Sequence, residues 1–177
     1  MIIVWFVLGI VVGAFALFLL MGVIHLRQSV RAIEQAQLNV KEEEIPNLTE
    51  ECIRVFREKL KKELSLNDYP NAARILDSAL EQENLQATKD AFATHELYWR
   101  FVLPMGAFLG ELVRANTSAT WKPSPIGVGL ALETQAMGFL HPFDKILKQV
   151  QTGDPGDLRF YVALCIKGTE GGPLTVE

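Results

Sequence analysis

The sequence predicts an α+β fold, with a single N-terminal transmembrane helix followed by a mainly helical domain that carries a small antiparallel sheet. The first 24 residues contain no ionisable side chain, as expected of a membrane span. Apolar residues then recur three and four positions apart over most of the chain, which is typical of amphipathic helices. Between Ala119 and Leu140 they alternate instead, which indicates strands.

Residues 1–25 form the predicted transmembrane anchor. A helix rises about 1.5 Å per residue, so the stretch from Met1 to Ile24 is long enough to cross a hydrocarbon layer of about 30 Å. The alternative, a cleaved secretory signal, requires a basic start, a shorter apolar run and a small-residue cleavage site, and this segment has none of them. Arg27 and Arg31 follow the span, which predicts a single-pass protein with its soluble domain in the cytoplasm.

Two features near the span favour contact between two copies of the chain. Gly9 and Gly13 form the G-x-x-x-G spacing that lets membrane helices approach closely, although this spacing also arises by chance. Residues 26–46 form a predicted helical stalk, whose apolar residues recur every seven positions at Leu26, Ile33 and Val40. These features predict a homodimer through the membrane helix or the stalk, or else a stalk that lies against the domain or the lipid surface.

Residues 47–167 form the predicted globular α+β domain, and residues 168–177 a flexible tail. The length after the span fits one domain with a sizeable core. Asn47, with Glu50 three positions later, predicts the N-cap of the first helix of this domain. That helix ends in the polar stretch "SLNDYPN".

Prolines divide the next part of the chain. Pro70 predicts the start of a second helix, which continues to Asn84 on a narrow apolar face. A third helix is predicted from Gln86 toward Phe101. Pro104 then kinks or ends it, and the segment from Met105 to Ala115 continues or restarts as a helix.

The strand pattern begins after Asn116. The stretch "ATWKPSP" favours a strand but holds two prolines, which indicates an edge strand or an extended connection. The stretch "IGVGLALET" predicts a strand with one bulky and one nearly bare face. Its bulky face has Val128, Leu130 and Leu132, and its bare face has Gly127, Gly129 and Ala131. A return strand from Met137 to Leu140 completes a small antiparallel pair.

Two further helices are predicted near the carboxyl end. Pro142 fits the first turn of one, which ends before Gly153. Its apolar residues have helical spacing, at Phe143, Ile146, Leu147 and Val150. The segment "DPGDLRFYVALCIKG" is ambiguous, because Asp154 and Asp157 favour a helix start while its apolar residues alternate as in a strand. We prefer the helix.

Charge and composition exclude several classes of function. The net charge is −4, and the one basic run, "REKLKKEL", is interleaved with glutamates, so we expect no nucleic-acid partner. No phosphate loop, dinucleotide fingerprint, nucleophile elbow or paired C-x-x-C is present, so we expect no cofactor and no metal. Cys52 and Cys165 lie in apolar segments and are expected to be buried free thiols.

The stretch "PMGAFLGELVRANTSATW" raises the question of whether Glu111 is catalytic or structural. Gly106 and Gly110 share one face of a helix, where each glycine costs about 1 kcal/mol relative to alanine, so a close neighbour is expected. The bare face of the predicted strand is a suitable neighbour. Gly106, Gly110 and Pro142 are therefore predicted to have structural roles.

A catalytic reading of Glu111 needs a second group, and His95 and His141 are the candidates. Neither has a metal-ligand spacing such as H-x-x-x-H. Glu111 can instead pair with Arg114 three positions on, or with Lys122. A lone carboxylate on a helix is usually structural, so we favour that role.

Aromatic residues offer candidates for a binding surface. These are Tyr98, Trp99, Phe101 and Trp121, although aromatic side chains more often belong to a core. With an anchor, a stalk and a compact domain, they predict a non-enzymatic binding or assembly module with an unknown protein partner. The alternative is a small membrane-anchored enzyme that uses Glu111 with His95 or His141.

The stretches "GAFLGELVRAN", "TW" and "HPFDKILKQVQTG" resemble a class of small uncharacterised bacterial domains. In that class a G-x-x-x-G-E helix is followed by a tryptophan strand and a P-F helix. The resemblance covers roughly residues 100–155. It implies a bacterial inner-membrane setting and an α+β core, and it assigns no catalytic residue.

Overall fold

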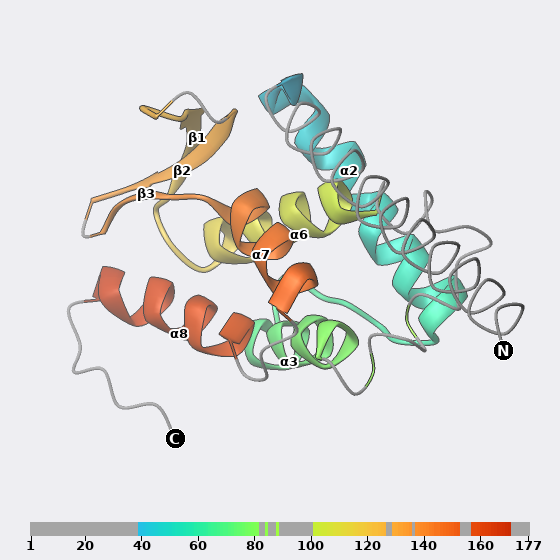
Figure 1. Ribbon diagram of the computed structural model, residues 1–177. Helices are drawn as coiled ribbons and strands as arrows, with labels where there is room; N and C mark the ends of the chain where they lie inside the picture. Colours follow the sequence, from blue (N-terminus) through green and yellow to red (C-terminus); the bar gives the residue numbers. More distant parts are fainter. Residues whose placement is uncertain are drawn as a thin grey trace, which may run out of the picture.

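The computed structural model describes residues 39–81, 84, 88, 101–126, 129–135, 137–152 and 157–170 (Figure 1). The predicted anchor with Gly9 and Gly13, most of the stalk and most of the third predicted helix, with His95, Tyr98 and Trp99, lie outside the described residues. Within these ranges no helix is both long and apolar enough to cross a bilayer.

The described part is mainly helical with a three-stranded antiparallel sheet, which confirms the α+β prediction for the domain. The helices are η1 (Glu42–Glu44), α2 (Ile45–Val55), η2 (Phe56–Leu60), α3 (Tyr69–Leu80), α6 (Val102–Ala115), α7 (Pro142–Thr152) and α8 (Asp157–Glu170). The strands are β1 (Thr120–Pro123), β2 (Leu130–Thr134) and β3 (Gly138–Leu140).

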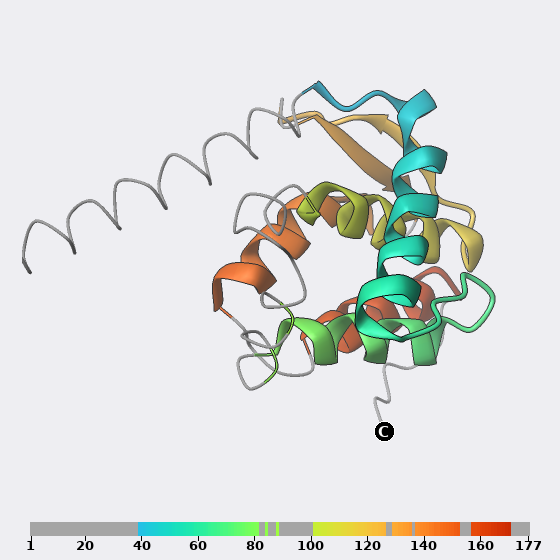
Figure 2. The same cartoon turned by 90° about the vertical axis from the view of Figure 1, so that its right-hand side faces the viewer.

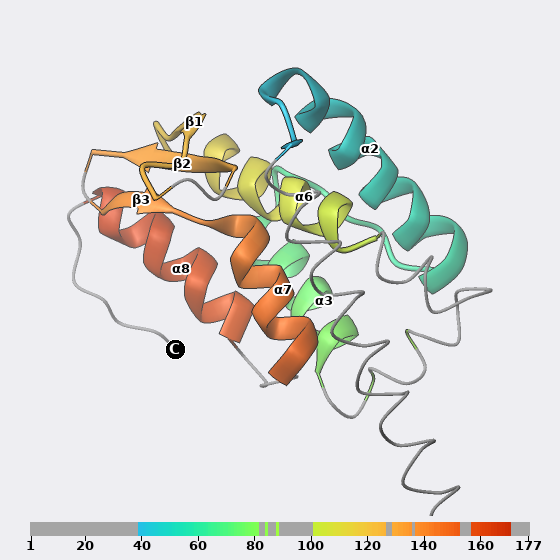
Figure 3. The ribbon, with the colours of Figure 1, turned by 45° about the horizontal axis from the view of Figure 1, so that its top comes forward.

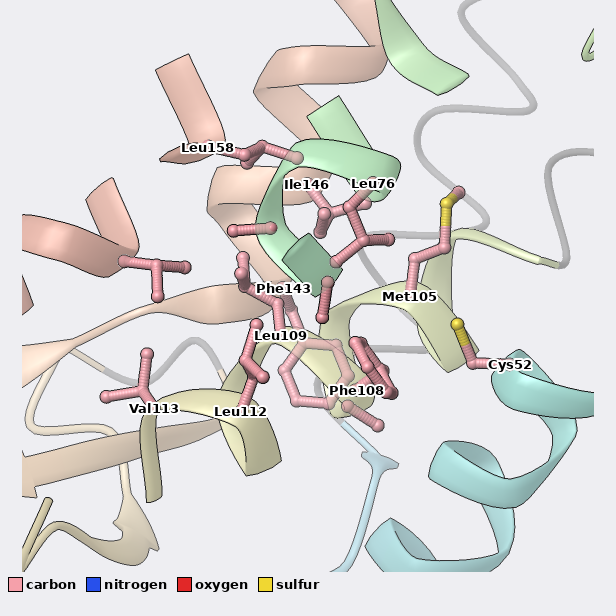
Figure 4. Packing of buried hydrophobic residues seen from close by; sticks show 14 of the residues in the cluster. Cys52, Leu76, Met105, Phe108, Leu109, Leu112, Val113, Phe143, Ile146 and Leu158 are labelled. Carbon is pink, nitrogen blue, oxygen red and sulfur yellow. The ribbon is translucent and has the colours of Figure 1, made fainter. Parts of the chain in front are cut away.

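Helix α6 is the centre of the core. Nearly every side chain from Val102 to Val113 is buried, so this helix is covered on all sides, as its high apolar content requires. Helices α2 and α7 pack against it, and α3 packs against α8. The sheet lies on one side of α6 and α2 on the other (Figure 3). Figure 4 shows side chains of α6, α7, α3 and α8 meeting in one apolar cluster.

The first helix begins earlier than predicted. Helix α2 starts at Ile45, and its second residue is Pro46, whose fixed φ favours the first turn of a helix. The predicted cap at Asn47 is wrong, because Asn47 is already inside the helix. Ile45, two positions before the predicted start of the domain, is only 1% exposed and belongs to the core. Val40, a predicted stalk residue, also packs against the core.

The end of the first helical segment is held by lysine. The chain leaves α2 through η2, which is a π-helical segment. Lys61 follows it in the left-handed conformation, with φ of 54°. Lys61 Nζ donates a hydrogen bond to the carbonyl of Glu58 at 2.7 Å, which satisfies one terminal acceptor. Helix α3 follows, with Asp68 as its N-cap and Pro70 in its first turn. It ends at Leu80 rather than Asn84.

The sheet has the order β1–β2–β3, and both pairs are antiparallel. Strand β1 is at the edge and Pro123 is its last residue, in agreement with the limits that proline sets on a strand. Strand β2 begins at Leu130, later than predicted, after Gly129 with φ of 80°. The predicted return strand is present as β3, and a third strand, β1, extends the predicted pair.

The two carboxyl-terminal helices are present. All four apolar residues predicted for the inner face of α7 are buried. The ambiguous segment after residue 156 is a helix, α8, in which Leu158 and Val162 are buried and Phe160 is exposed. Helix α8 continues to Glu170 and so includes the first three residues of the predicted tail, which begins at residue 168.

Candidate functional site

The glycines of α6 admit two aromatic side chains. A Cβ atom at Gly110 would overlap the indole ring of Trp121 on β1, and one at Gly106 would overlap the ring of Phe143 on α7. The predicted neighbour, the bare face of the strand near Ala131, is therefore wrong for both glycines. Side chains from two different elements, rather than a strand backbone, fill the space that the glycines leave.

Trp121 and Phe143 also contact each other. Their ring centroids are 5.8 Å apart at an interplanar angle of 39°, within the range of favourable aromatic pairs. Pro142, the first residue of α7, lies beside Gly110, with Cγ 3.3 Å from where a Cβ would be. This arrangement fastens α6 to both β1 and α7.

The described aromatic candidates for binding are core residues. The side chain of Trp121 is buried. Phe101 is also buried, at the start of α6, and its ring centroid lies 5.8 Å from that of Phe56. Neither ring faces solvent, so neither supplies a surface patch. Tyr98 and Trp99 lie outside the described residues.

Glu111 is 8% exposed and is fully engaged by two side chains. Oε1 accepts hydrogen bonds from Trp121 Nε1 and Arg114 Nε, both at 2.8 Å. Oε2 accepts one from Arg114 Nη2 at 2.7 Å. Arg114 is thus the partner, as the i,i+3 spacing predicts, and the bond from the indole could not be read from spacing.

Burial and hydrogen bonding act on Glu111 in opposite directions. Burial alone would raise the pKa of this carboxyl, but the hydrogen bonds from Arg114 and Trp121 outweigh burial and hold the pKa below its ordinary value. A general acid at neutral pH needs a raised pKa, so the arrangement disfavours that role. Glu111 is a fixed anion that joins α6 to β1.

His141 lies at the start of α7. Its carbonyl oxygen accepts a hydrogen bond from the backbone N–H of Lys145 at 3.0 Å, which opens the helix. Its Nδ1 is buried and has no hydrogen-bond partner within the described ranges. No cluster of three or more His, Cys, Asp or Glu side chains suited to a metal is found among the described residues.

Asp77 is a buried carboxylate that the sequence reasoning missed. It lies on α3, is 0% exposed, and accepts a hydrogen bond from the backbone N–H of Leu158 at 3.1 Å. Arg159 Nε donates to its second oxygen at 3.1 Å. Asp77 therefore caps the first turn of α8 from another helix. The only sequence signal was a carboxylate next to the apolar face residue Leu76.

The two thiols are buried and free. Burial raises the pKa of Cys52 well above its ordinary value, and the nearby Glu51 adds to this effect. Burial also raises the pKa of Cys165 to about 12. Neither sulfur is ionised at neutral pH, so neither has the thiolate character of a catalytic nucleophile.

Lys145 connects α7 to α8. Its ammonium group forms an ion pair with Asp157 in the first turn of α8 and lies 5.4 Å from the centroid of the Tyr161 ring. Burial raises the pKa of Tyr161, whose side chain faces Cys165. These contacts hold the two helices together.

Compared with models of protein families, with curated proteins and with solved structures, the chain has no match.

Proposed function

We propose that this chain is a single-pass membrane-anchored protein whose domain serves as a non-enzymatic binding or assembly module. The observation that carries the anchor is the absence of any ionisable side chain from Met1 to Ile24, in a chain in which 21% of all residues are charged. Arg27 and Arg31 follow the span and favour an orientation with the domain in the cytoplasm. The resemblance of residues 100–155 to bacterial domains favours the cell inner membrane.

The non-enzymatic role is supported by the state of the candidate catalytic groups. Glu111 is ionised, buried and held by Arg114 and Trp121, which gives it a structural task. The thiols of Cys52 and Cys165 are buried with raised pKa values. A module that binds a protein partner needs none of these groups to react.

Reporter fusions test the anchor and its orientation. Alkaline phosphatase, which requires an oxidising compartment, or a fluorescent protein that matures in the cytoplasm, is fused to the carboxyl terminus of the full-length chain. We expect the fluorescent fusion to fluoresce and the phosphatase fusion to be inactive. We also expect both fusions to stay in the membrane fraction after a wash with alkaline carbonate. Phosphatase activity would contradict the orientation, and release by carbonate would contradict the anchor.

The Glu111→Gln variant separates a module from an enzyme, because it keeps the shape of the side chain and removes its charge. For a module, cells with normal levels of folded Glu111→Gln protein should behave like the wild type. Glu133→Gln, at an exposed position of β2, is the matched control. If cells with folded Glu111→Gln protein behaved like a deletion strain while cells with Glu133→Gln protein behaved like the wild type, an enzyme that uses the Glu111 carboxylate would be favoured.

A further inference from the structure

The β2–β3 hairpin contacts the end of α8 through a methionine side chain. A Cβ atom at Gly168 of α8 would lie 2.8 Å from Sδ of Met137 and 3.3 Å from its Cγ. Gly168 therefore leaves room for the thioether, which packs directly against the helix. Figures 1 and 3 both show the start of β3 beside the carboxyl end of α8. Met137 thus belongs to the contact between the hairpin and this helix.

The backbone of Met137 is held by the turn of the hairpin. Its N–H donates a hydrogen bond to Thr134 Oγ1 at 3.0 Å, and the Thr134 hydroxyl donates to the carbonyl of Gly138, also at 3.0 Å. Gly138 has φ of 70°, a conformation that suits glycine. Because the turn is held in this way, a change in the size or polarity of the Met137 sulfur acts mainly on α8.

The start of α8 is held by a separate set of contacts. Asp77 on α3 accepts hydrogen bonds from the N–H of Leu158 and from Arg159, and α3 and α8 lie side by side (Figure 2). Gly168 follows Leu158 by ten positions, about 15 Å along the helix. A disturbance at Gly168 can therefore loosen the end of α8 without releasing its start.

Met137 is the sulfur-bearing side chain of the domain that a small oxidant reaches most easily. Met137 is only partly buried, whereas Met105 on α6 is 0% exposed. A thioether reacts with hydrogen peroxide as it stands, whereas a thiol must first lose its proton. Burial raises the pKa of both Cys52 and Cys165, which keeps them as thiols. Among the sulfur atoms of the described residues, that of Met137 should therefore react first.

We propose that Met137 is a peroxide-sensitive switch that controls access to Cys165. The Met137 sulfur attacks one oxygen of hydrogen peroxide: an S–O bond forms, the O–O bond breaks, the sulfur loses two electrons, and the second oxygen leaves as water. The product, methionine sulfoxide, is larger and polar, so it no longer fits against Gly168 and turns toward water. The end of α8 then separates from the hairpin. Cys165, three positions before Gly168 on the same side of the helix, becomes exposed.

Mass spectrometry and thiol labelling of the full-length chain in detergent micelles test this proposal. The chain is treated with dilute hydrogen peroxide, catalase removes the remaining peroxide, and the thiols are labelled with a maleimide under native conditions. We expect sulfoxide to form several-fold faster at Met137 than at Met105. The labelling of Cys165 should rise several-fold in step with the oxidation of Met137, while that of Cys52 on α2 stays unchanged.

Leucine substitutions give the matched variants, because leucine is close to methionine in volume and is not oxidised by peroxide. Met137→Leu should keep Cys165 protected after peroxide treatment, whereas Met105→Leu should respond like the wild type. Methionine sulfoxide reductase, added to the oxidised wild-type chain, should restore the protection of Cys165. This last measurement uses only the wild-type chain, so it decides the matter even if a variant fails to fold.

Three results would overturn the proposal. The first is oxidation of Met105 or Cys165 before Met137. The second is a chain fully oxidised at Met137 in which Cys165 is labelled as slowly as in the untreated chain. The third is a folded Met137→Leu variant in which peroxide still exposes Cys165, because the switch would then lie at another residue.

Discussion

Two buried carboxylates, Glu111 and Asp77, join different pairs of elements in this fold. Glu111 lies in the α6–β1 contact, which we define as Gly110, Glu111, Arg114 and Trp121. Asp77 lies in the α3–α8 contact, defined as Asp77, Leu158 and Arg159. Each carboxylate binds one arginine whose side chain is about half exposed, at 50% and 51%.

The difference between the two contacts lies in the distance to their partners along the chain. Glu111 binds Arg114 three positions on and Trp121 ten positions on. Asp77 binds the backbone of Leu158, 81 positions on, and Arg159, 82 positions on. The α6–β1 contact can form as soon as one helix and one turn exist. The α3–α8 contact requires most of the domain to be in place.

Gly110→Leu should have the largest effect on the α6–β1 contact. The added side chain would occupy the space of the Trp121 indole, and overpacking of this kind should lower the free energy of unfolding by about 3 kcal/mol. Ala115→Leu, at an exposed position of the same helix, adds a similar side chain without a neighbour and is the control. If the Gly110→Leu variant had the same melting temperature as the wild type, the close approach of the Trp121 indole to Gly110 would be contradicted.

Asp77→Ala should have the next largest effect and acts on the α3–α8 contact. It leaves the buried N–H of Leu158 unsatisfied and removes the partner of Arg159, which together should cost about 2 to 3 kcal/mol. Asp77→Asn keeps an acceptor for the N–H and should cost less. Asp68→Ala removes only the exposed cap of α3 and should cost about 1 kcal/mol. If Asp77→Ala lowered the free energy of unfolding by no more than Asp68→Ala does, the capping of α8 by Asp77 would be contradicted.

A double-mutant cycle measures the bond between Glu111 and Trp121, and its effect should be smaller. Glu111→Gln should cost about 2 kcal/mol, since hydrogen bonds to a buried charge are lost or weakened. Trp121→Phe removes the indole donor. The two substitutions should be coupled by about 1 kcal/mol in chemical denaturation, because the residues are in direct contact. Strict additivity would mean that the indole bond contributes nothing to stability.

Local signals predicted the helices well where proline or charge marks their starts. Pro70 and Pro142 lie in the first turns of α3 and α7, because a fixed φ near −65° suits that position. In α8 the acidic residue Asp157 in the first turn was the better guide, and the alternating apolar residues that favour a strand were misleading. Asn47 failed as a cap because Ile45 and Pro46 start α2 before it.

Contacts between distant elements could not be predicted in the same way. The spacing of Gly106 and Gly110 indicated a close neighbour but could not identify Trp121 and Phe143, since that depends on how β1 and α7 return to α6. Asp77 had no local partner to reveal it. For the candidate site, sequence spacing therefore predicted the pairing of Glu111 with Arg114 and missed the indole bond that completes it.

The titration of Glu111 tests most directly the claim that this carboxylate is structural. In the full-length chain, NMR of the Glu111 carboxyl carbon should give a pKa below the ordinary value of 4.5. The stability that its ionised form contributes is then fully present above pH 4.5 and is lost as the pH falls through the lowered pKa. Glu111→Gln should accordingly differ from the wild type in unfolding free energy at neutral pH and less so in acid. A pKa above 4.5 would contradict the structural role of Glu111, because a carboxyl with a raised pKa is suited to transfer a proton.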